Sequence, residues 1–248
     1  MNQLNSMTIR IQHTKEESRF AKLFPSFLAF YFALDADNEK IKKFGWDMFF
    51  GGFGFSNLAY APIFIIVGGE KLTFQNTEAG FQYLKYLYLD KDKEIYKRFA
   101  KCNGQEAWDV RCDLMNNRPD LIPDFTYYGY GRWGAMLELL RCKFTQNEHL
   151  RFELLATGDA FLMEHNTKTG KDLYFSNNHV GDGLNWLGYQ LMIVRAELNG
   201  NTFFPKWLST HINMTTGESL AKDDEKCFLK EAVRYFTVEE VHVLFPPL

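Results

Sequence analysis

The clearest local pattern lies in residues 60–85, whose sequence is YAPIFIIVGGEKLTFQNTEAGFQYLK. Residues 60–67 are apolar, and the two glycines that follow favour a turn. Residues 71–74 can then return as a second strand. We therefore expect a β-hairpin at the start of this stretch.

A helix is expected directly after the hairpin. Asn76 or Thr77 can cap its first turn, and Phe81, Leu84 and Tyr88 recur at helical spacing. We therefore expect this helix to continue to about residue 88.

The rest of the chain alternates helix patterns with polar connections and contains no internal repeat. One more strand is expected at residues 162–164, and a polar loop at residues 170–183. Further helices are expected at residues 92–101, 105–115, 135–144, 149–156, 187–198 and 225–236. We expect a mostly helical domain at residues 44–198. Residues 1–43 would be an N-terminal extension, with a strand at 7–12 and a helix at 16–33, and residues 199–248 a C-terminal extension packed on the same domain.

Composition and charge exclude several classes of protein. Of 248 residues, 46% are hydrophobic and 24% charged, which is typical of a globular chain. The net charge of −3 argues against strong non-specific binding to nucleic acid. The first residues lack the pattern of a secretory signal, and no apolar run is long enough to span a membrane, so we expect a cytoplasmic protein. The four cysteines have no zinc-ligand spacing, and no metal or cofactor is expected.

Three residues of the predicted helix carry candidate chemistry. Glu78, Gln82 and Lys85 are spaced so that they share roughly one helix face. A carboxylate there could activate water or stabilise a cationic sugar during cleavage of a glycosidic bond. Glu78 could instead simply complement the helix dipole.

Two other groups of residues are candidates for binding. The loop at residues 170–183 contains two aspartates and ends in a Gly-Asp-Gly segment before a helix, so its backbone N–H groups could face a phosphate or hydroxyl. The aromatic cluster at residues 127–133 could stack on a base. The plain alternatives are a surface connection and core packing.

These segments coincide in order and spacing with the motifs of the NADAR family, which the chain resembles over residues 44–198. Residues 54–57 are similar to its FSN signature, and residues 77–85 to its S-E-H-x-x-Q-x-x-K helix. The other matching motifs are the K-F pair at 143–144, the L-L-A-T-G turn at 154–158, the L-V-E strand at 162–164 and the G-x-G-x-N segment within 181–195.

The resemblance implies a compact, single-domain α+β fold, mostly helical with a small β-sheet, whose members cleave N-glycosidic bonds without a metal. It implies that Glu78 and Asp172 are catalytic. The residues that it implies for substrate binding are Ser56, Asn57, Gln82, Lys85, Tyr128, Trp133, Phe175, Gly181, Gly183 and Asn185. We expect the substrate to lie between Glu78 and the loop that carries Asp172.

The chain departs from the family pattern in the loop and the helix. Phe175, Ser176 and Asn177 stand where the family has Trp-Gly-Asp, and Ala79 replaces the usual histidine. Tyr128 occupies the position of a stacking tryptophan, and Trp133 lies close to it in sequence. Loss of the carboxylate at Asn177 could narrow the substrate range.

The expected function is hydrolysis of the ribose C1′–N bond in ADP-ribosylated guanine, with an ADP-ribose-containing nucleotide or modified nucleic acid as partner. One alternative is an N-glycosidase that acts on a ribosylaminopyrimidine phosphate of riboflavin biosynthesis. Another is a module that binds NAD or ADP-ribose without cleaving it, and a third is a purely structural protein.

Overall fold

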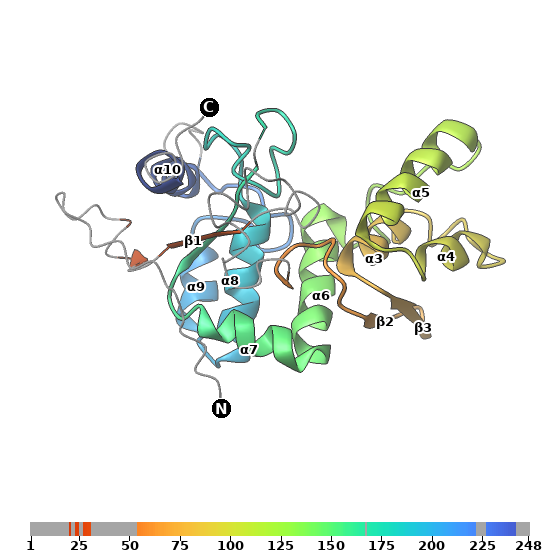
Figure 1. Cartoon of the computed structure of the whole chain (residues 1–248), viewed down its shortest axis with the longest axis horizontal. Helices are drawn as coiled ribbons and strands as arrows, with labels where there is room; N and C mark the ends of the chain where they lie inside the picture. Colours follow the sequence, from red (N-terminus) through yellow and green to blue (C-terminus); the bar gives the residue numbers. More distant parts are fainter. Residues whose placement is uncertain are drawn as a thin grey trace, which may run out of the picture. The chain divides into compact units, whose positions relative to one another are not determined.

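The computed structural model describes residues 20, 23–24, 27–30, 54–166, 168–221 and 227–241. These residues form helices and two small, two-stranded sheets (Figure 1). The expected mostly helical α+β class is confirmed. The chain divides into two compact units. Unit 1 contains the described residues of Met1–Phe53, Glu153–Ile212 and Ser219–Leu248, and unit 2 contains Gly54–Phe152 and Asn213–Glu218.

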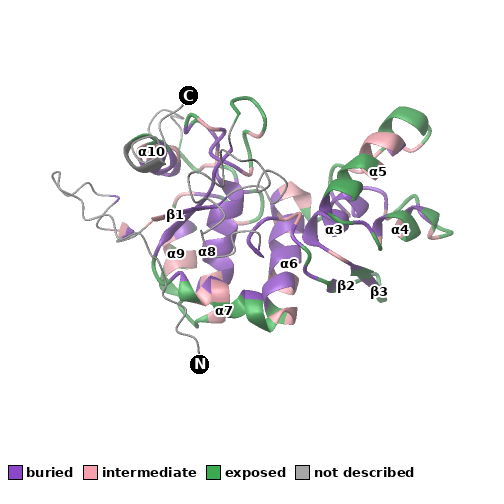
Figure 2. Ribbon diagram, viewed as in Figure 1, coloured by how far each residue is buried: buried purple, intermediate pink, exposed green. Residues whose placement is uncertain are grey.

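Unit 2 consists of a β-hairpin and helices that pack on it and on one another. Its elements are β2 (Ile63–Val67), β3 (Glu70–Phe74), α3 (Thr77–Tyr83), α4 (Glu94–Phe99), α5 (Gly104–Asn117) and α6 (Gly131–Gln146). Helix α3 contacts α4, α5 and α6, and α6 also contacts β2. Figure 2 shows α3 buried along its length, whereas much of α4 and α5 is exposed. Helix α7 (Glu148–Ala156) contains the boundary between the units.

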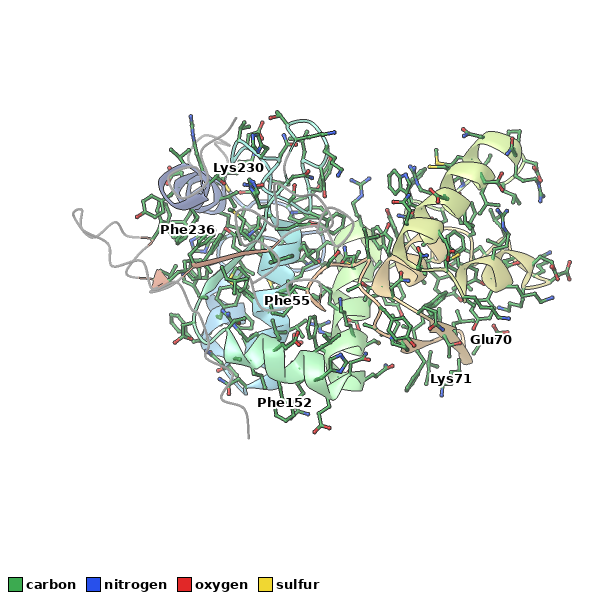
Figure 3. All side chains as sticks on the ribbon, in the orientation of Figure 1. Phe55, Glu70, Lys71, Phe152, Lys230 and Phe236 are labelled. Atoms are coloured by element: carbon green, nitrogen blue, oxygen red, sulfur yellow. The ribbon has the colours of Figure 1, made fainter. Side chains whose placement is uncertain are left out.

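The expected hairpin is present. Strands β2 and β3 are antiparallel, from the pair Ile63 and Phe74 to the pair Val67 and Glu70, and Gly68 and Gly69 make the turn at positive φ. Figure 3 labels Glu70 and Lys71 beside this turn. Alternate residues of β2 are buried, as expected for a strand with one face on a core.

Side chains form hydrogen bonds with the backbone of β2 and of the residue before it, on the edge of β2 away from β3. The Gln146 amide accepts a hydrogen bond from the Phe64 N–H at 2.8 Å and donates one to the Phe64 carbonyl at 2.8 Å. The Asn147 amide donates to the Pro62 carbonyl at 3.0 Å. Two side chains therefore take the place of a neighbouring strand.

Helix α3 begins where the sequence predicts. Asn76 is its N-cap, and its side-chain oxygen accepts from the Ala79 N–H at 2.8 Å. The helix ends at Tyr83, earlier than the predicted residue 88, because the chain continues in turns held by bonds such as Tyr86 N–H to Tyr83 C=O at 2.8 Å.

Unit 1 contains a parallel strand pair and helices. Its elements are β1 (Phe27–Phe30), β4 (Phe161–Glu164), α8 (Trp186–Leu198), α9 (Phe203–Leu208), α10 (Phe228–Tyr235) and the π-helix η5 (Phe236–Val241). Phe236, labelled in Figure 3, stacks on Phe161 and Phe27, with ring centroids 4.5 and 5.2 Å apart. Aromatic stacking thus fixes the π-helix against both strands.

The helix expected over residues 16–33 is wrong at Phe27–Phe30, which form β1. These residues pair in parallel with β4, and the pairing outweighs the local preference of an apolar Phe- and Leu-rich run. The strand expected over residues 7–12 lies outside the described residues.

Helix α8 packs closely on β4. A Cβ added to Gly188 would lie 2.1 Å from the Leu162 carbonyl oxygen, so only glycine permits this approach. Almost every residue of α8 is buried, which explains its strongly apolar sequence. No helix in the described part of the chain is both long and apolar enough to cross a membrane.

Candidate active site

The three helix residues singled out by spacing form one hydrogen-bonded chain in unit 2. The Gln82 Nε2 donates to Glu78 Oε1 at 2.6 Å, and the Lys85 Nζ donates to Gln82 Oε1 at 2.6 Å. All three side chains are buried, and Glu78 is 9% exposed. Both ends of the Gln82 amide are therefore occupied. This bridging position lets Gln82 hold Glu78, and its expected part in substrate binding stays a prediction.

Lys85 lies in an aromatic cage. Its Nζ is 5.3 Å from the ring centroid of Tyr127, 5.5 Å from that of Phe81 and 5.9 Å from that of Phe125. Burial lowers the pKa of Lys85 to about 8, and the charge of Glu78 acts against this shift. The Lys85 amine is thus a cation at neutral pH that loses its proton under mildly alkaline conditions.

The loop before the hairpin holds the start of α3. The Asn57 carbonyl accepts from the Glu78 N–H at 3.0 Å, and the Ser56 carbonyl accepts from the Lys143 Nζ at 2.7 Å. Phe55, labelled in Figure 3, packs against Phe144 of α6, and their ring centroids are 6.2 Å apart. The Asn57 side-chain oxygen is buried and has no hydrogen-bond partner among the described residues. Such an acceptor is rare in a folded protein, which supports Asn57 as a substrate contact.

The two candidate stacking residues differ in accessibility. Tyr128 is half-buried, and its ring centroid is 4.4 Å from that of Tyr88. Trp133 is 0% exposed, and its indole N–H donates to the Met214 carbonyl at 3.0 Å. The structure gives Trp133 a place in the core of unit 2, so Tyr128 is the better placed of the two to meet a base.

Two arginines in unit 2 were missed by the sequence analysis. The charges of Arg111 on α5 and Arg132 on α6 both lower the pKa of Lys85, after the larger effect of burial. Arg132 also hydrogen-bonds the Tyr127 side chain. Neither lies in a motif near Glu78, and only the packing of α3 on α5 and α6 relates them to Lys85.

The predicted loop residues belong to unit 1. Asp172 Oδ1 accepts from the backbone N–H of Tyr174 at 2.9 Å and of Phe175 at 3.0 Å, so it shapes the turn. The Phe175 ring meets Trp186 edge-on at 5.8 Å. Because Glu78 and Asp172 lie in different units, their expected pairing stays a prediction.

Gly181, Gly183 and Asn185 have structural roles. A Cβ on Gly183 would lie 2.2 Å from the Ser176 carbonyl oxygen. Gly181 has φ +85°, and a Cβ there would lie 3.0 Å from the Arg234 Cα. Asn185 is fully buried, accepts from the Glu164 N–H at 3.0 Å and donates to the Leu162 carbonyl at 2.9 Å. These contacts fix the loop on β4 and leave the Asn185 amide engaged at both ends.

The departure at Asn177 is built into a buried network. The Asn177 Nδ2 donates to Thr237 Oγ1 at 3.0 Å and lies 3.0 Å from His165 Nδ1. The Asn177 Oδ1 accepts from the backbone N–H groups of Asn166 and His179, each at 3.0 Å. An ionised aspartate could not make the donor contacts. In the described residues, no group of three or more His, Cys, Asp or Glu side chains is arranged to hold a metal ion.

A comparison with protein families decides the relationship. The NADAR domain model matches residues 48–199, more than half of the chain. This chain belongs to the NADAR family.

NADAR relatives include N-glycosidase YbiA of Escherichia coli (strain K12), 46% identical over 144 residues that cover 58% of this chain and 80% of YbiA. The maize riboflavin biosynthesis protein PYRR, chloroplastic, is 27% identical over 161 residues, 62% of this chain and 24% of that protein. The chain thus spans about a quarter of the length of the maize protein. A riboflavin biosynthesis protein of Vibrio vulnificus is 47% identical over 64 residues, 26% of this chain and 17% of that protein.

The NMR structure of E. coli YbiA superimposes with a TM-score of 0.47, at 26% sequence identity, over 77% of this chain and 91% of YbiA.

Proposed function

We propose that the protein is a hydrolase that cleaves the ribose C1′–N bond of an ADP-ribosylated guanine base. The observation that carries the proposal is the buried Glu78–Gln82–Lys85 chain at the start of α3. The name of the relative YbiA, an N-glycosidase, supports the broader class of a hydrolase acting on N-glycosyl bonds.

Glu78 is the catalytic group in this proposal. Its carboxylate, held by Gln82, accepts a proton from the attacking water and stabilises positive charge on the sugar as the bond to nitrogen lengthens. The Gln82 amide fixes one carboxylate oxygen and so orients the carboxylate for its work on the attacking water. The charge of Glu78 in turn helps to keep Lys85 protonated.

Other residues would bind the substrate. Tyr128, half-buried with its ring beside Tyr88, offers a face for stacking on the base. Asn57 offers a buried acceptor for a donor of the substrate. For Asp172 we keep the sequence-based proposal of a second catalytic carboxylate, and Asp172→Asn should lower turnover.

A ribosylaminopyrimidine phosphate is the second candidate substrate. Relatives in maize and Vibrio vulnificus are named riboflavin biosynthesis proteins, which favours this compound. Both substrates have an N-glycosyl bond and phosphate, so the same Glu78 chemistry serves either.

The test is a product assay on ADP-ribosylated guanine in DNA and on the ribosylaminopyrimidine phosphate, side by side. We expect Glu78→Gln to lower kcat by about 10²- to 10⁴-fold on the preferred substrate, the range of a general base. Glu94→Gln, the same exchange on an exposed carboxylate in the first turn of α4, is the matched control and should keep wild-type turnover.

Wild-type kcat in Glu78→Gln would remove the proposed catalytic centre. Tight ADP-ribose binding without product from either substrate would instead indicate a binding module.

A further inference from the structure

The connection from α5 to α6 (Figure 1) contains strained backbone beside the candidate site. We call residues 124–131 of this connection the tyrosine turn. Tyr127 and Tyr128 have φ of +52° and +60°, in the left-handed region that side chains other than glycine rarely adopt. Two bulky residues in succession keep this conformation only where other contacts hold it, and such strain is concentrated at functional sites. The contacts that hold the turn therefore bear on the function of the site.

The side chain of Asp124 holds this backbone. Its Oδ1 accepts from the Thr126 N–H at 2.8 Å and from the Thr126 hydroxyl at 2.6 Å, and its Oδ2 accepts from the Tyr128 N–H at 3.0 Å. Burial acts to raise the pKa of Asp124, but these hydrogen bonds outweigh it and lower the pKa below its ordinary value. Asp124 is thus a carboxylate at neutral pH, and hydrogen bonds to a charged group are stronger than those between neutral groups.

The backbone of Asp124 anchors the start of the turn beside Lys85. The Asp124 N–H donates to the Lys85 carbonyl at 2.7 Å, and the Asp124 carbonyl accepts from the Tyr127 N–H at 3.1 Å. The Tyr127 ring is buried and stacks on Phe81 of α3, with ring centroids 4.6 Å apart. The same ring lies 5.3 Å from Lys85 Nζ. Tyr127 is therefore fixed by its own packing, whereas the backbone of the next residue is held by the Asp124 carboxylate.

That next residue, Tyr128, lies between the end of α3 and the hairpin. Its ring centroid is 4.4 Å from that of Tyr88, and a Cβ added to Gly68 in the hairpin turn would lie 3.3 Å from its hydroxyl. Tyr128 is half-buried, so part of its ring is open to solvent. The rotamers open to a side chain depend on its backbone dihedral angles. The left-handed backbone that Asp124 holds thus sets the direction of the Tyr128 ring.

We propose that Asp124 is a positioning residue, whose carboxylate holds the tyrosine turn so that Tyr128 presents its ring to the base of the substrate. The inference rests on the proposed function, because the base is that of the N-glycoside cleaved at Glu78. Asp124 itself touches no substrate and acts through the Tyr128 ring.

The test is titration calorimetry of the full chain with each of the two candidate substrates. The parent protein is Glu78→Gln, so that the ligands stay intact. We expect Asp124→Ala to weaken binding of the preferred substrate by about 10-fold, within the range of one base–aromatic stack. Asp120→Ala is the matched control, because this exposed aspartate lies in the same connection and pairs with Arg118. It should bind like the parent.

A double-mutant cycle separates positioning from a general loss of folding. If Asp124 acts through Tyr128, then Asp124→Ala should weaken binding little further in Tyr128→Ala, because the ring that it orients is already absent. Melting temperatures of the same variants report any loss of folding separately.

The conservative variant Asp124→Asn gives a second measurement. It keeps one acceptor oxygen and replaces the other with a donor, so its affinity should fall between those of the parent and of Asp124→Ala. In steady-state assays with Glu78 intact, Asp124→Asn should raise KM and leave kcat within a few-fold of wild type, about as expected for uniform binding.

Equal losses from Asp124→Ala with and without the Tyr128 ring would overturn the inference, as would unchanged affinity in Asp124→Ala or a parent that binds neither ligand. The inference fails alone if wild type cleaves its substrate and the cycle shows no coupling. The proposed function fails alone if the coupling is present but wild type releases no product from either N-glycoside.

Discussion

At the residue scale, Lys85 couples the candidate site to pH. Burial lowers its pKa from 10.5 to about 8. Below pH 8 the amine is protonated in the folded and the unfolded chain. Between about pH 8 and 10.5 the folded chain has lost this proton and the unfolded chain has not, so the unfolded state binds more protons. The contribution of Lys85 to stability therefore rises with pH across this window.

Replacing Lys85 by Met should remove that rise. The window is about 2.5 pH units wide and each unit corresponds to about 1.4 kcal/mol, so the stability of wild type relative to Lys85→Met should rise by about 3 kcal/mol. Urea denaturation of both proteins at pH 7.5 and pH 10.5 measures this difference. A constant difference between the two curves would contradict the low pKa.

The sequence predicts which side chains of the candidate site in unit 2 lie together better than it predicts their contacts. Helical spacing places Glu78, Gln82 and Lys85 on one face, and the structure confirms that they lie together. Spacing cannot show which atom of the Gln82 amide faces which neighbour. Nor can it find Arg111 and Arg132, because their relation to Lys85 arises only when α5 and α6 pack on α3.

At the scale of elements, the loop before α8 is held by Asn177, at the position where the resemblance implies an aspartate. The Thr237 hydroxyl donates to the Val233 carbonyl at 2.8 Å, so it can only accept from Asn177. Asn177→Asp would place an acceptor against an acceptor in a fully buried position.

We expect Asn177→Asp to lower the free energy of unfolding by about 1–3 kcal/mol at neutral pH. Burial favours the protonated form of a carboxyl, which can donate again, so the loss should shrink as the pH falls towards 5. Chemical denaturation at pH 5 and pH 7.5 measures the loss of unfolding free energy in Asn177→Asp at each pH. Asn201→Asp, the same exchange at an exposed position, is the control. Equal losses at both sites would show that the network does not need a donor.

Elements with a clear local pattern were predicted, including strand β4 at residues 162–164, whereas its distant partner β1 was not. The hairpin and the helices corresponding to α4, α5, α6, α7, α8 and α10 are confirmed, with shifted ends. Strand β1 was missed because its partner, β4, lies far along the chain. Helix α9 and the π-helix η5 were not predicted, and η5 follows α10 directly in the chain.

At the scale of the whole molecule, a short segment beyond the NADAR match completes unit 2. Residues 213–218 belong to this unit, and Met214 accepts the hydrogen bond of the buried Trp133 indole. A Cβ on Gly217 would lie 2.4 Å from the Trp133 ring, and Gly217 has φ +72°. Unit 2 thus includes residues that lie outside the range matched by the NADAR model.

Gly217→Ala should therefore destabilise the protein more than the same exchange at another glycine with a similar positive φ. Gly200 has φ +67° with open space around its Cβ position, so Gly200→Ala isolates the cost of the conformation. We expect Gly217→Ala to cost about 1–3 kcal/mol more, from overpacking against the indole. Thermal unfolding of the two variants, with Trp fluorescence as a probe, measures the difference, and equal melting temperatures would contradict the close contact.

The amide of Gln146 has a consequence for behaviour at high concentration. A strand with open N–H and C=O groups is a template on which another molecule can extend the sheet, and the neighbouring Ile66 is 68% exposed and apolar. Because Gln146 occupies both backbone groups of Phe64, a second hairpin has no continuous row of partners to join. One polar side chain at the end of α6 therefore interrupts the row of backbone groups along which another strand would have to pair.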